Sequence, residues 1–468
     1  MEKIKIENSN GIGKEIYELI QELFPICRSI TGDGVRETLK IIKKHIPLEI
    51  VEVPTGTKVF DWEIPKEWNI SDAYIKNSKG EKIIDFKKSN LHVLNYSIPI
   101  HKKISLTELK DHIFTLPEHP DWIPYRTSYY KENWGFCMTH NQFQNLKDEQ
   151  YEVCIDSSLI NGNLTYGEIF LEGERKDEVL FSCYVCHPSM CNDNLSGVAL
   201  LTHLAKEIIK TKQNLSYRFL FIPETIGAIT WLSKNEEKTK NIKHGLVATC
   251  LGDSGITTYK KTRDGDNIID IIATKVLTES KEPYEIIDFF PTGSDERQFC
   301  SPGFNLPIGS LMKTIYDRFK EYHTSADNLS YVNPKSLGNS FETYLKIIKE
   351  LEVVNVKNGL KQKMVENKTS TKINEEIYYE NLNPKCEPQL GRRGIYNLIG
   401  AQKNNIQNML PIFWVLNLSD GTNSISDIVN KSNLGIQDIK NAIDILMKNN
   451  LIKNNNDNTF MEKSFKNR

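Results

Sequence analysis

The sequence predicts an α/β protein whose central sheet is buried and largely parallel. Between residues 151 and 350, short continuous apolar runs alternate with longer segments of helical periodicity. This alternation is typical of strands that are covered by helices on both faces. Two stretches differ from it: residues 57–150 lack long amphipathic helices, and the C-terminal part follows a polar segment. We therefore expect three folded units in the 468 residues, in line with about one domain per 150 residues.

The composition indicates a globular protein and excludes several classes of partner. Lys and Arg total 59 against 61 Asp and Glu, so the net charge of -2 gives no general attraction to nucleic acid or anionic lipid. No apolar run reaches the ~18 residues of a membrane span, and the charged N-terminus lacks the apolar segment of a signal peptide. Nine cysteines, an odd number, argue against a disulfide framework. We expect a cytoplasmic protein.

The first part of the α/β domain is predicted over residues 1–56. Apolar spacing indicates two helices over 14–45, separated by a break at 31–34, and a strand over 48–53. The next segment, 57–150, is rich in Trp, Tyr and Pro and contains short alternating runs. We expect it to be a small, mostly-β domain inserted into the α/β domain.

The core of the α/β domain is predicted over residues 151–355, where apolar strands are followed by helices. The predicted strands are 178–186, 217–223 and 245–252, and the predicted helices are 197–209, 226–235 and 340–354.

A separate C-terminal domain is predicted over residues 385–468, after a polar linker over 356–384. Three helices followed by a hairpin form a winged-helix pattern. Residues 411–468 carry seven Lys or Arg and six Asp or Glu, whereas a DNA reader normally has a concentrated basic face. We therefore expect this domain to contact a protein partner or a second copy of the chain, and not nucleic acid.

The densest group of reactive residues is the segment 186–197, where a buried strand ends and a helix begins. Ligands of open α/β sheets bind just beyond such strand ends. His187 and Asp193 could converge there on one divalent ion, through an imidazole nitrogen and a carboxylate oxygen. An equally simple explanation is a histidine that caps a turn and an aspartate that caps the helix.

Three further strands or loops end in polar groups at the same predicted edge of the sheet. Glu224 follows one strand, Asp253 follows the next, and a later loop carries Asp295. Tyr322 and His323 come after these. Each has a structural explanation by itself, such as a helix N-terminal carboxylate or a turn residue. Their common position makes one shared site the better explanation.

The motifs DNLSG, PETIG, GD, GSDERQF and YHTSADN, in this order, resemble those of zinc-dependent aminopeptidases of the M28 type. The β insertion and the winged helix are similar to a bacterial subgroup of aminopeptidase-like proteins, sometimes linked to polysaccharide biosynthesis. The resemblance implies a three-layer α/β/α mixed sheet of the zinc-exopeptidase kind. It also implies a zinc-dependent hydrolase that cleaves a small peptide or a related amide-bearing substrate through a metal-activated water.

The resemblance further implies roles for individual residues. His187, Asp193, Asp253 and His323 match metal ligands, with Asp193 as the bridging aspartate. Glu224 matches the general base. Substrate-binding roles fall on Asp295, in the Ser-Asp pair of the family's substrate loop, and on Tyr322. Apart from the resemblance, the aromatic and basic run over 125–130 offers Arg126 as a further substrate-binding residue. Arg126 could hold a carboxylate or phosphate with its two-pronged guanidinium, and its alternative is packing within the inserted domain.

Two departures from the family pattern bear on the number of metal ions. The second of two consecutive family acids, a metal ligand, is Thr225 here, and His187 stands only six residues before Asp193 instead of about twenty. We therefore expect one zinc ion held by His187, Asp193 and His323. The sequence does not decide whether a second ion binds. The alternatives are a catalytically weakened, metal-binding relative and a winged-helix regulator whose α/β unit senses a ligand.

The string Cys183-Tyr184-Val185-Cys186-His187 also matches a c-type haem attachment sequence. A strand would direct Cys183 and Cys186 to opposite faces, so we expect buried core cysteines instead.

Overall fold

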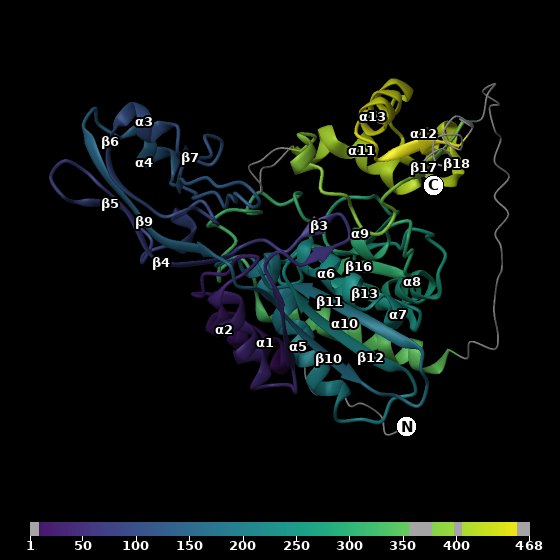
Figure 1. Ribbon diagram of the computed structural model, residues 1–468. Helices are drawn as coiled ribbons and strands as arrows, with labels where there is room; N and C mark the ends of the chain where they lie inside the picture. The colour runs from purple at the N-terminus through teal and green to yellow at the C-terminus, as the bar shows by residue number, and fades with distance from the viewer. Residues whose placement is uncertain (1–8, 355–376, 397–404, 456–468) are drawn as a thin grey trace.

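The computed structural model describes residues 9–354, 377–396 and 405–455. A central eight-stranded sheet carries helices on both faces, with one domain projecting from its side and another lying above it (Figure 1). In spatial order the strands are β1 (Glu49–Pro54), β10 (Asn163–Leu171), β12 (Ser216–Ile222), β11 (Glu178–Tyr184), β13 (Ile242–Ala248), β16 (Ile308–Met312), β14 (Thr257–Lys260) and β15 (Tyr284–Ile287).

The sheet is parallel at its centre and antiparallel towards its edges. Strands β12, β11, β13 and β16 run in one direction, whereas β1, β10 and β14 each form an antiparallel pair. Every residue of β11 and β12 is buried, which explains their continuous apolar sequences. The predicted three-layer arrangement with a mixed sheet is confirmed.

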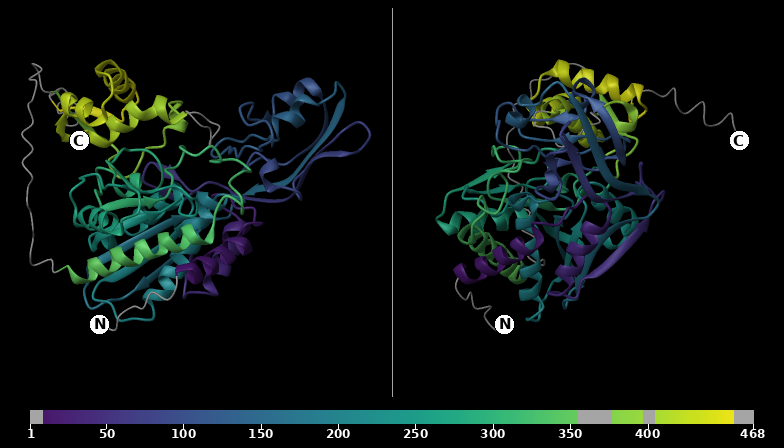
Figure 2. Two further views of the ribbon diagram at one scale, coloured as in Figure 1. Left: turned by 180° about the vertical axis from the view of Figure 1, so that it is seen from behind. Right: turned by 90° about the vertical axis from the view of Figure 1, so that its left-hand side faces the viewer.

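Helices on one face of the sheet form the larger half of the core (Figure 2, left). They are α1 (Ser9–Leu23), α2 (Asp33–Lys43), α5 (Ser196–Ile208), α8 (Ile268–Ser280) and α10 (Pro334–Val353). The other face carries the shorter helices α6 (Ile226–Lys234), α7 (Glu236–Thr239) and α9 (Glu296–Phe299). Helix α10 begins six residues before its predicted start, because Asn333 caps it by accepting the Ser336 N–H at 2.9 Å and Pro334 fits its first turn.

An arm, residues 67–160, projects from the side of the core between β1 and β10 (Figures 1 and 2). Its antiparallel sheet contains β5 (Lys82–Asp85), β4 (Glu67–Lys76), β9 (Gln150–Ile160) and β6 (Ile100–Ser105). Smaller elements are α3 (Leu106–Lys110), α4 (His140–Gln144), β7 (Ile113–Phe114) and β8 (Phe136–Cys137). The preceding hairpin of β2 (Lys58–Val59) and β3 (Trp62–Glu63) packs on the core instead of on the arm's own apolar cluster.

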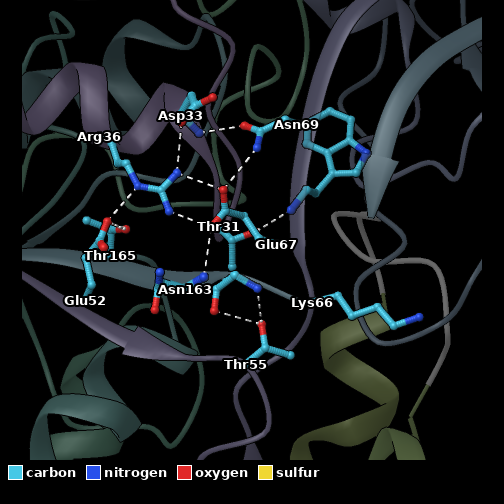
Figure 3. Close-up of polar contacts among 12 residues, drawn as sticks. Thr31, Asp33, Arg36, Glu52, Thr55, Lys66, Glu67, Asn69, Asn163 and Thr165 are labelled. Carbon is cyan, nitrogen blue, oxygen red and sulfur yellow. Dashed lines mark hydrogen bonds and ion pairs between the residues drawn. The ribbon is translucent and has the colours of Figure 1, made fainter. Parts of the chain in front are cut away.

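A network of charged groups holds the root of the arm (Figure 3). Both nitrogens at the end of Arg36 donate to the Glu67 carboxylate, at 2.8 and 2.5 Å. Arg36 also donates to Glu52 at 2.7 Å and to Asp33 at 2.9 Å, and the backbone N–H of Asn163 donates to Glu67 at 2.8 Å. The hydrogen bonds from Arg36, which outweigh the effect of burial, lower the pKa of Glu67 to about 2. The network ties β4 of the arm to α2, β1 and β10 of the core.

Within the described part of the C-terminal domain, three α-helices accompany a three-stranded sheet. These are β17 (Tyr378–Asn381), α11 (Asn405–Leu418), β18 (Asp420–Ser424), α12 (Ile425–Ser432), α13 (Ile436–Lys448) and β19 (Ile452–Asn454). Strand β17 lies in the segment predicted as a linker and pairs with both β18 and β19. Residues 356–376 of that segment and most of the predicted terminal hairpin lie outside the described residues.

None of the helices in the described ranges is long and apolar enough to cross a membrane. All nine cysteines fall within these ranges, and each is a free thiol.

We expect Glu67→Gln to destabilise the protein by about 2 kcal/mol at pH 7, because it leaves the largely buried Arg36 without its main partner. Since the folded state lowers the pKa of Glu67, this contribution is present above pH ~4.5 and is lost as the pH falls towards 2. The difference between wild type and variant in urea unfolding should therefore shrink below pH ~4.5.

A matched control is Glu18→Gln, which removes an exposed ion pair with Lys14 at 3.9 Å. It should change the free energy of unfolding by less than about 0.5 kcal/mol at any of these pH values. Equal effects of the two variants would contradict the structural role of the Arg36–Glu67 pair.

Candidate metal and catalytic site

His187 lies in the loop that follows β11, at the carboxyl edge of the central sheet. Its side chain is 6% exposed, and its backbone carbonyl accepts a hydrogen bond from Arg28 Nε at 2.9 Å. Its Nδ1 contacts Cys186 Sγ at 3.5 Å, while its Nε2 lies 3.8 Å from Glu224 Oε2. The loop thus directs the second ring nitrogen towards the strand end that carries Glu224.

Asp193 is held by two groups that the sequence did not single out. The backbone N–H groups of Asn192 and Asp193 donate to the carboxylate of Asp327, at 2.6 and 2.9 Å. The hydroxyl of Tyr184, the last residue of β11, donates to Asp193 Oδ1. Burial acts to raise the pKa of Asp193, but His187, His323 and Tyr184 together bring it below its ordinary value. Asp193 is therefore fixed in position and favours the ionised form.

His323 reaches the same point from the loop between β16 and α10. Its Nε2 lies 3.0 Å from Asp193 Oδ2, and its ring centre lies 5.4 Å from that of His187. One potential ligand atom from each of His187, Asp193 and His323 lies within 4.8 Å of the other two. The structure thus brings together residues that are 136 positions apart in the sequence, as 323 − 187 = 136.

Three aromatic rings surround the two imidazoles. Tyr322 stacks on His323 with ring centres 3.9 Å apart. The ring of Tyr125, from the arm, lies 5.2 Å from His187 and 5.3 Å from His323, and Tyr184 lies 5.1 Å from His187. The arm and the core therefore enclose the site together.

Glu224 is the second residue after β12 and is partly buried beside His187. Burial, followed by the charges of Asp295 and Asp193, raises the pKa of Glu224 well above its ordinary value. The next residue, Thr225, has a φ of 63° and donates its backbone N–H to Asp295 Oδ1 at 2.6 Å. Burial, with a smaller effect of Glu296, raises the pKa of Asp295 to about 7. Asp295 thus supports the turn that carries Glu224.

Asp253 lies at the expected strand end, but the structure does not place it with the other potential ligands. Its Oδ1 accepts from Thr314 Oγ1 at 2.6 Å and from Gly255 N–H at 2.7 Å. Its Oδ2 accepts from Asn192 Nδ2 at 2.9 Å and from Thr314 N–H at 3.2 Å. The carboxylate therefore joins the loops after β11, β13 and β16, and it lies outside the groups of potential metal ligands among the described residues.

Arg126 is buried in the arm, where its Nη1 donates to the carbonyl of Tyr125 at 2.7 Å. Burial lowers its pKa, and the nearby charges that oppose this effect are Cys137 and Glu118, also in the arm. The side chain of this segment that contacts the two histidines is Tyr125, the preceding residue.

Cys186 is the other potential ligand near His187 and Glu224. Burial raises the pKa of its thiol well above the ordinary value, so it is protonated and a poor metal ligand. Cys183 packs in the apolar cluster on one face of the sheet and Cys186 in that on the other. This separation agrees with the expected core cysteines and not with haem attachment.

Sequence reasoning missed Tyr184, Asp327 and Tyr125. Asp327 stands in the YHTSADN motif four residues after His323, so the motif itself carried a signal for it. The positions of Tyr184 and Tyr125 depend on contacts with other segments, which no local sequence pattern predicts.

Two family models match the chain. The first, described as "Domain of unknown function (DUF4910)", covers residues 17–354, and the second, a winged helix-turn-helix, covers residues 377–454. The second match agrees with β17 as the start of the C-terminal domain and confirms the expected winged helix.

Similar proteins occur in Clostridium acetobutylicum. One, named "Putative polysaccharide biosynthesis protein with aminopeptidase-like domain", is 58% identical over 455 residues, covering 97% of this chain and 100% of the relative. The crystal structure of a "putative peptidase" from that organism has 56% identity and a TM-score of 0.73, covering 96% and 97% of the two chains.

A zinc aminopeptidase from Bacillus subtilis shares the fold at 11% identity. Its structure superposes with a TM-score of 0.54 over 72% of this chain and 95% of its own. This likeness confirms the expected fold of the core.

We expect Tyr184→Phe to weaken Zn²⁺ binding about tenfold, because it removes the hydroxyl that orients Asp193. Competition with a chromophoric chelator would measure the affinity. Tyr217→Phe is the matched control, since it removes the bond of another buried tyrosine hydroxyl, to Glu352 at 2.7 Å, from the neighbouring strand. Equal Zn²⁺ affinity of the two variants would contradict the role of Tyr184.

Proposed function

Since the chain belongs to the family described as a domain of unknown function (DUF4910), and its core has the fold of zinc aminopeptidases, we propose that it is a zinc-dependent, aminopeptidase-like hydrolase. Its substrate in this proposal is a small peptide or a molecule with a related amide bond. The observation that carries the proposal is the convergence of His187, Asp193 and His323 beside Glu224.

The donor set fits zinc. Two imidazole nitrogens and one carboxylate are typical ligands of catalytic zinc, which leaves a fourth position open. Because Asp253 is occupied by hydrogen bonds and Thr225 offers only a hydroxyl, one ion per chain is the number that these residues support. When bound, zinc supplies a Lewis acid that lowers the pKa of water towards ~7 and polarises a carbonyl group.

Glu224 is the proposed general base. It would accept a proton from the attacking water and deliver it to the leaving nitrogen. Burial and the charges of Asp295 and Asp193 raise the pKa of its carboxyl, which is the direction expected of a carboxyl that accepts and releases a proton. Asp295 holds the turn of Glu224 through the backbone of Thr225, and Tyr184 holds the carboxylate of Asp193. The rings of Tyr125 and Tyr322 pack against the imidazoles and restrict their orientation.

The name of the Clostridium relative widens the choice of substrates. It links that protein to polysaccharide biosynthesis, so an amide on a carbohydrate precursor stands beside a peptide as a candidate. A second candidate function, metal binding without catalysis, is favoured by one observation, the hydroxyl of Thr225 in place of a carboxylate. Hydrolysis of aminoacyl anilides and N-acetylated amino sugars by the zinc-loaded protein would separate the two functions.

We expect Glu224→Gln to lower kcat by about 100- to 10,000-fold, because the amide cannot accept the proton. The zinc content should stay at the wild-type value, since Glu224 is outside the proposed ligand set. Initial rates and metal analysis of the same preparation would test both statements. The control is Glu174→Gln, which alters an exposed carboxylate paired with Lys212. Wild-type activity of Glu224→Gln would exclude it as the base.

We expect His323→Ala to lose bound zinc and Asp253→Asn to retain it. The first change removes a proposed ligand, whereas the second alters a carboxylate that supports neighbouring loops. Metal analysis after dialysis against a weak chelator would give the stoichiometry, with one zinc per chain expected for the wild type. Loss of zinc from Asp253→Asn with an unchanged melting temperature would show that Asp253 binds the metal.

A further inference from the structure

We propose that the C-terminal domain completes the candidate active site, because its residue Glu387 holds Arg297 in the place from which Arg297 supports the turn of Glu224. The inference rests on the proposed role of Glu224 as the general base. Arg297 and Glu387 are positioning residues in this proposal.

Arg297 lies between the core and the C-terminal domain. Its Nη2 donates to Thr225 Oγ1 at 3.2 Å, and its Nη1 forms an ion pair with Glu387. Its guanidinium lies 5.7 Å from the ring centre of Phe413 in α11. One side chain thus contacts the residue next to Glu224 and two residues of the C-terminal domain.

The segment around Glu387 is bound closely to the core. The N–H of Glu387 donates to Gln298 Oε1 at 2.9 Å, and its carbonyl accepts from Trp62 Nε1 at 2.7 Å. The N–H of Cys386 donates to Ser301 Oγ at 2.9 Å. These bonds fix the position of the Glu387 carboxylate relative to the segment that contains Arg297.

The ion pair is largely shielded from water, with side-chain exposures of 17% for Arg297 and 15% for Glu387. A charge in such surroundings is costly without its partner, so removal of Glu387 should displace Arg297. The guanidinium would then no longer be held beside the Thr225 hydroxyl.

The turn itself depends on support from other segments. Thr225 adopts a φ of 63°, a conformation that a β-branched residue rarely takes. Its backbone N–H is held by Asp295 and its hydroxyl by Arg297, so both supports come from residues 295–297. Since Glu387 anchors this segment, the position of Glu224 depends on the C-terminal domain.

A second ion pair joins the same two domains at another place and serves as a control. Arg263 donates to Asp420 at 2.7 Å and to Asn417 at 2.9 Å. Within the part of the chain that the structure describes, neither Arg263 nor Asp420 forms a hydrogen bond or ion pair with residues 224–225. Loss of this pair should weaken the contact between the domains without disturbing the turn.

The test uses the full-length protein with Glu387→Gln, Arg297→Gln, their combination, and Asp420→Asn. We expect Glu387→Gln and Arg297→Gln each to lower kcat about 10- to 100-fold, with KM changed less than about threefold and zinc content unchanged. The double variant should be no slower than Arg297→Gln, because the two residues act as one unit. Asp420→Asn should keep kcat within about twofold, even where its melting temperature falls.

Hydrogen exchange gives a readout that does not require activity. The backbone amide of residue 225 should exchange faster in Glu387→Gln. It should also exchange faster in Thr225→Val, which removes the hydroxyl that Arg297 binds and keeps the Arg297–Glu387 pair. It should exchange at the wild-type rate in Asp420→Asn. Thr225→Val also replaces Glu387→Gln if the latter does not fold.

Wild-type kcat and wild-type exchange at Thr225 in Glu387→Gln would overturn the inference and leave the proposed function standing. An equal loss of kcat in Asp420→Asn would also overturn it, because general docking of the domain would then explain the effect. A wild-type protein that hydrolyses none of the substrates would contradict the proposed function, and the exchange rates would still decide the positioning role.

Discussion

The carboxylate of Asp327 joins the two loops that carry the proposed ligands, although it is not one of these ligands. It accepts the N–H groups of two consecutive residues, Asn192 and Asp193, which belong to the loop after another strand. Because Asp327 and His323 lie in one short segment, this single contact sets the distance between His323 and Asp193. His187 is in the same loop as Asp193, and Arg28 binds its carbonyl there. The relative position of Asp193 and His323 thus depends on one buried pair of hydrogen bonds.

The sequence predicted the core and the edge of the sheet at which the site lies. The core could be predicted because apolar strands and amphipathic helices repeat over a few residues. The edge could be predicted because the strand ends of a parallel sheet lie together. His187, Asp193, Glu224 and His323 were found in this way. Asp253 met the same criterion, but its hydrogen bonds with Asn192 and Thr314 could not be predicted, because these donors come from distant loops that no local pattern reveals.

Non-local pairing also explains the other differences. Strand β17 has a polar composition and resembles a linker until β18 and β19 pair with it on both sides. Tyr125 lies in a segment without regular periodicity, and its N–H bond of 2.8 Å to the carbonyl of His323 brings it to the site. From the sequence, Thr225 is a hydroxyl in the place of a family metal ligand. In the structure its N–H donates to Asp295 and its hydroxyl accepts from Arg297. Such supports become visible only when the chain is folded.

The two crossings of the chain between core and arm meet at one point. Thr55 N–H donates to the carbonyl of Gly162 at 2.9 Å, and Gly162 N–H donates back to Thr55 Oγ1 at 3.0 Å, immediately beyond the paired strands β1 and β10. Everything between these residues therefore replaces the turn of an ordinary β-hairpin. During evolution, such a hairpin could gain, exchange or lose the intervening chain at a loop-closure cost that grows only slowly with length. A change in the length or sequence of the arm can thus leave the pairing of β1 with β10 intact.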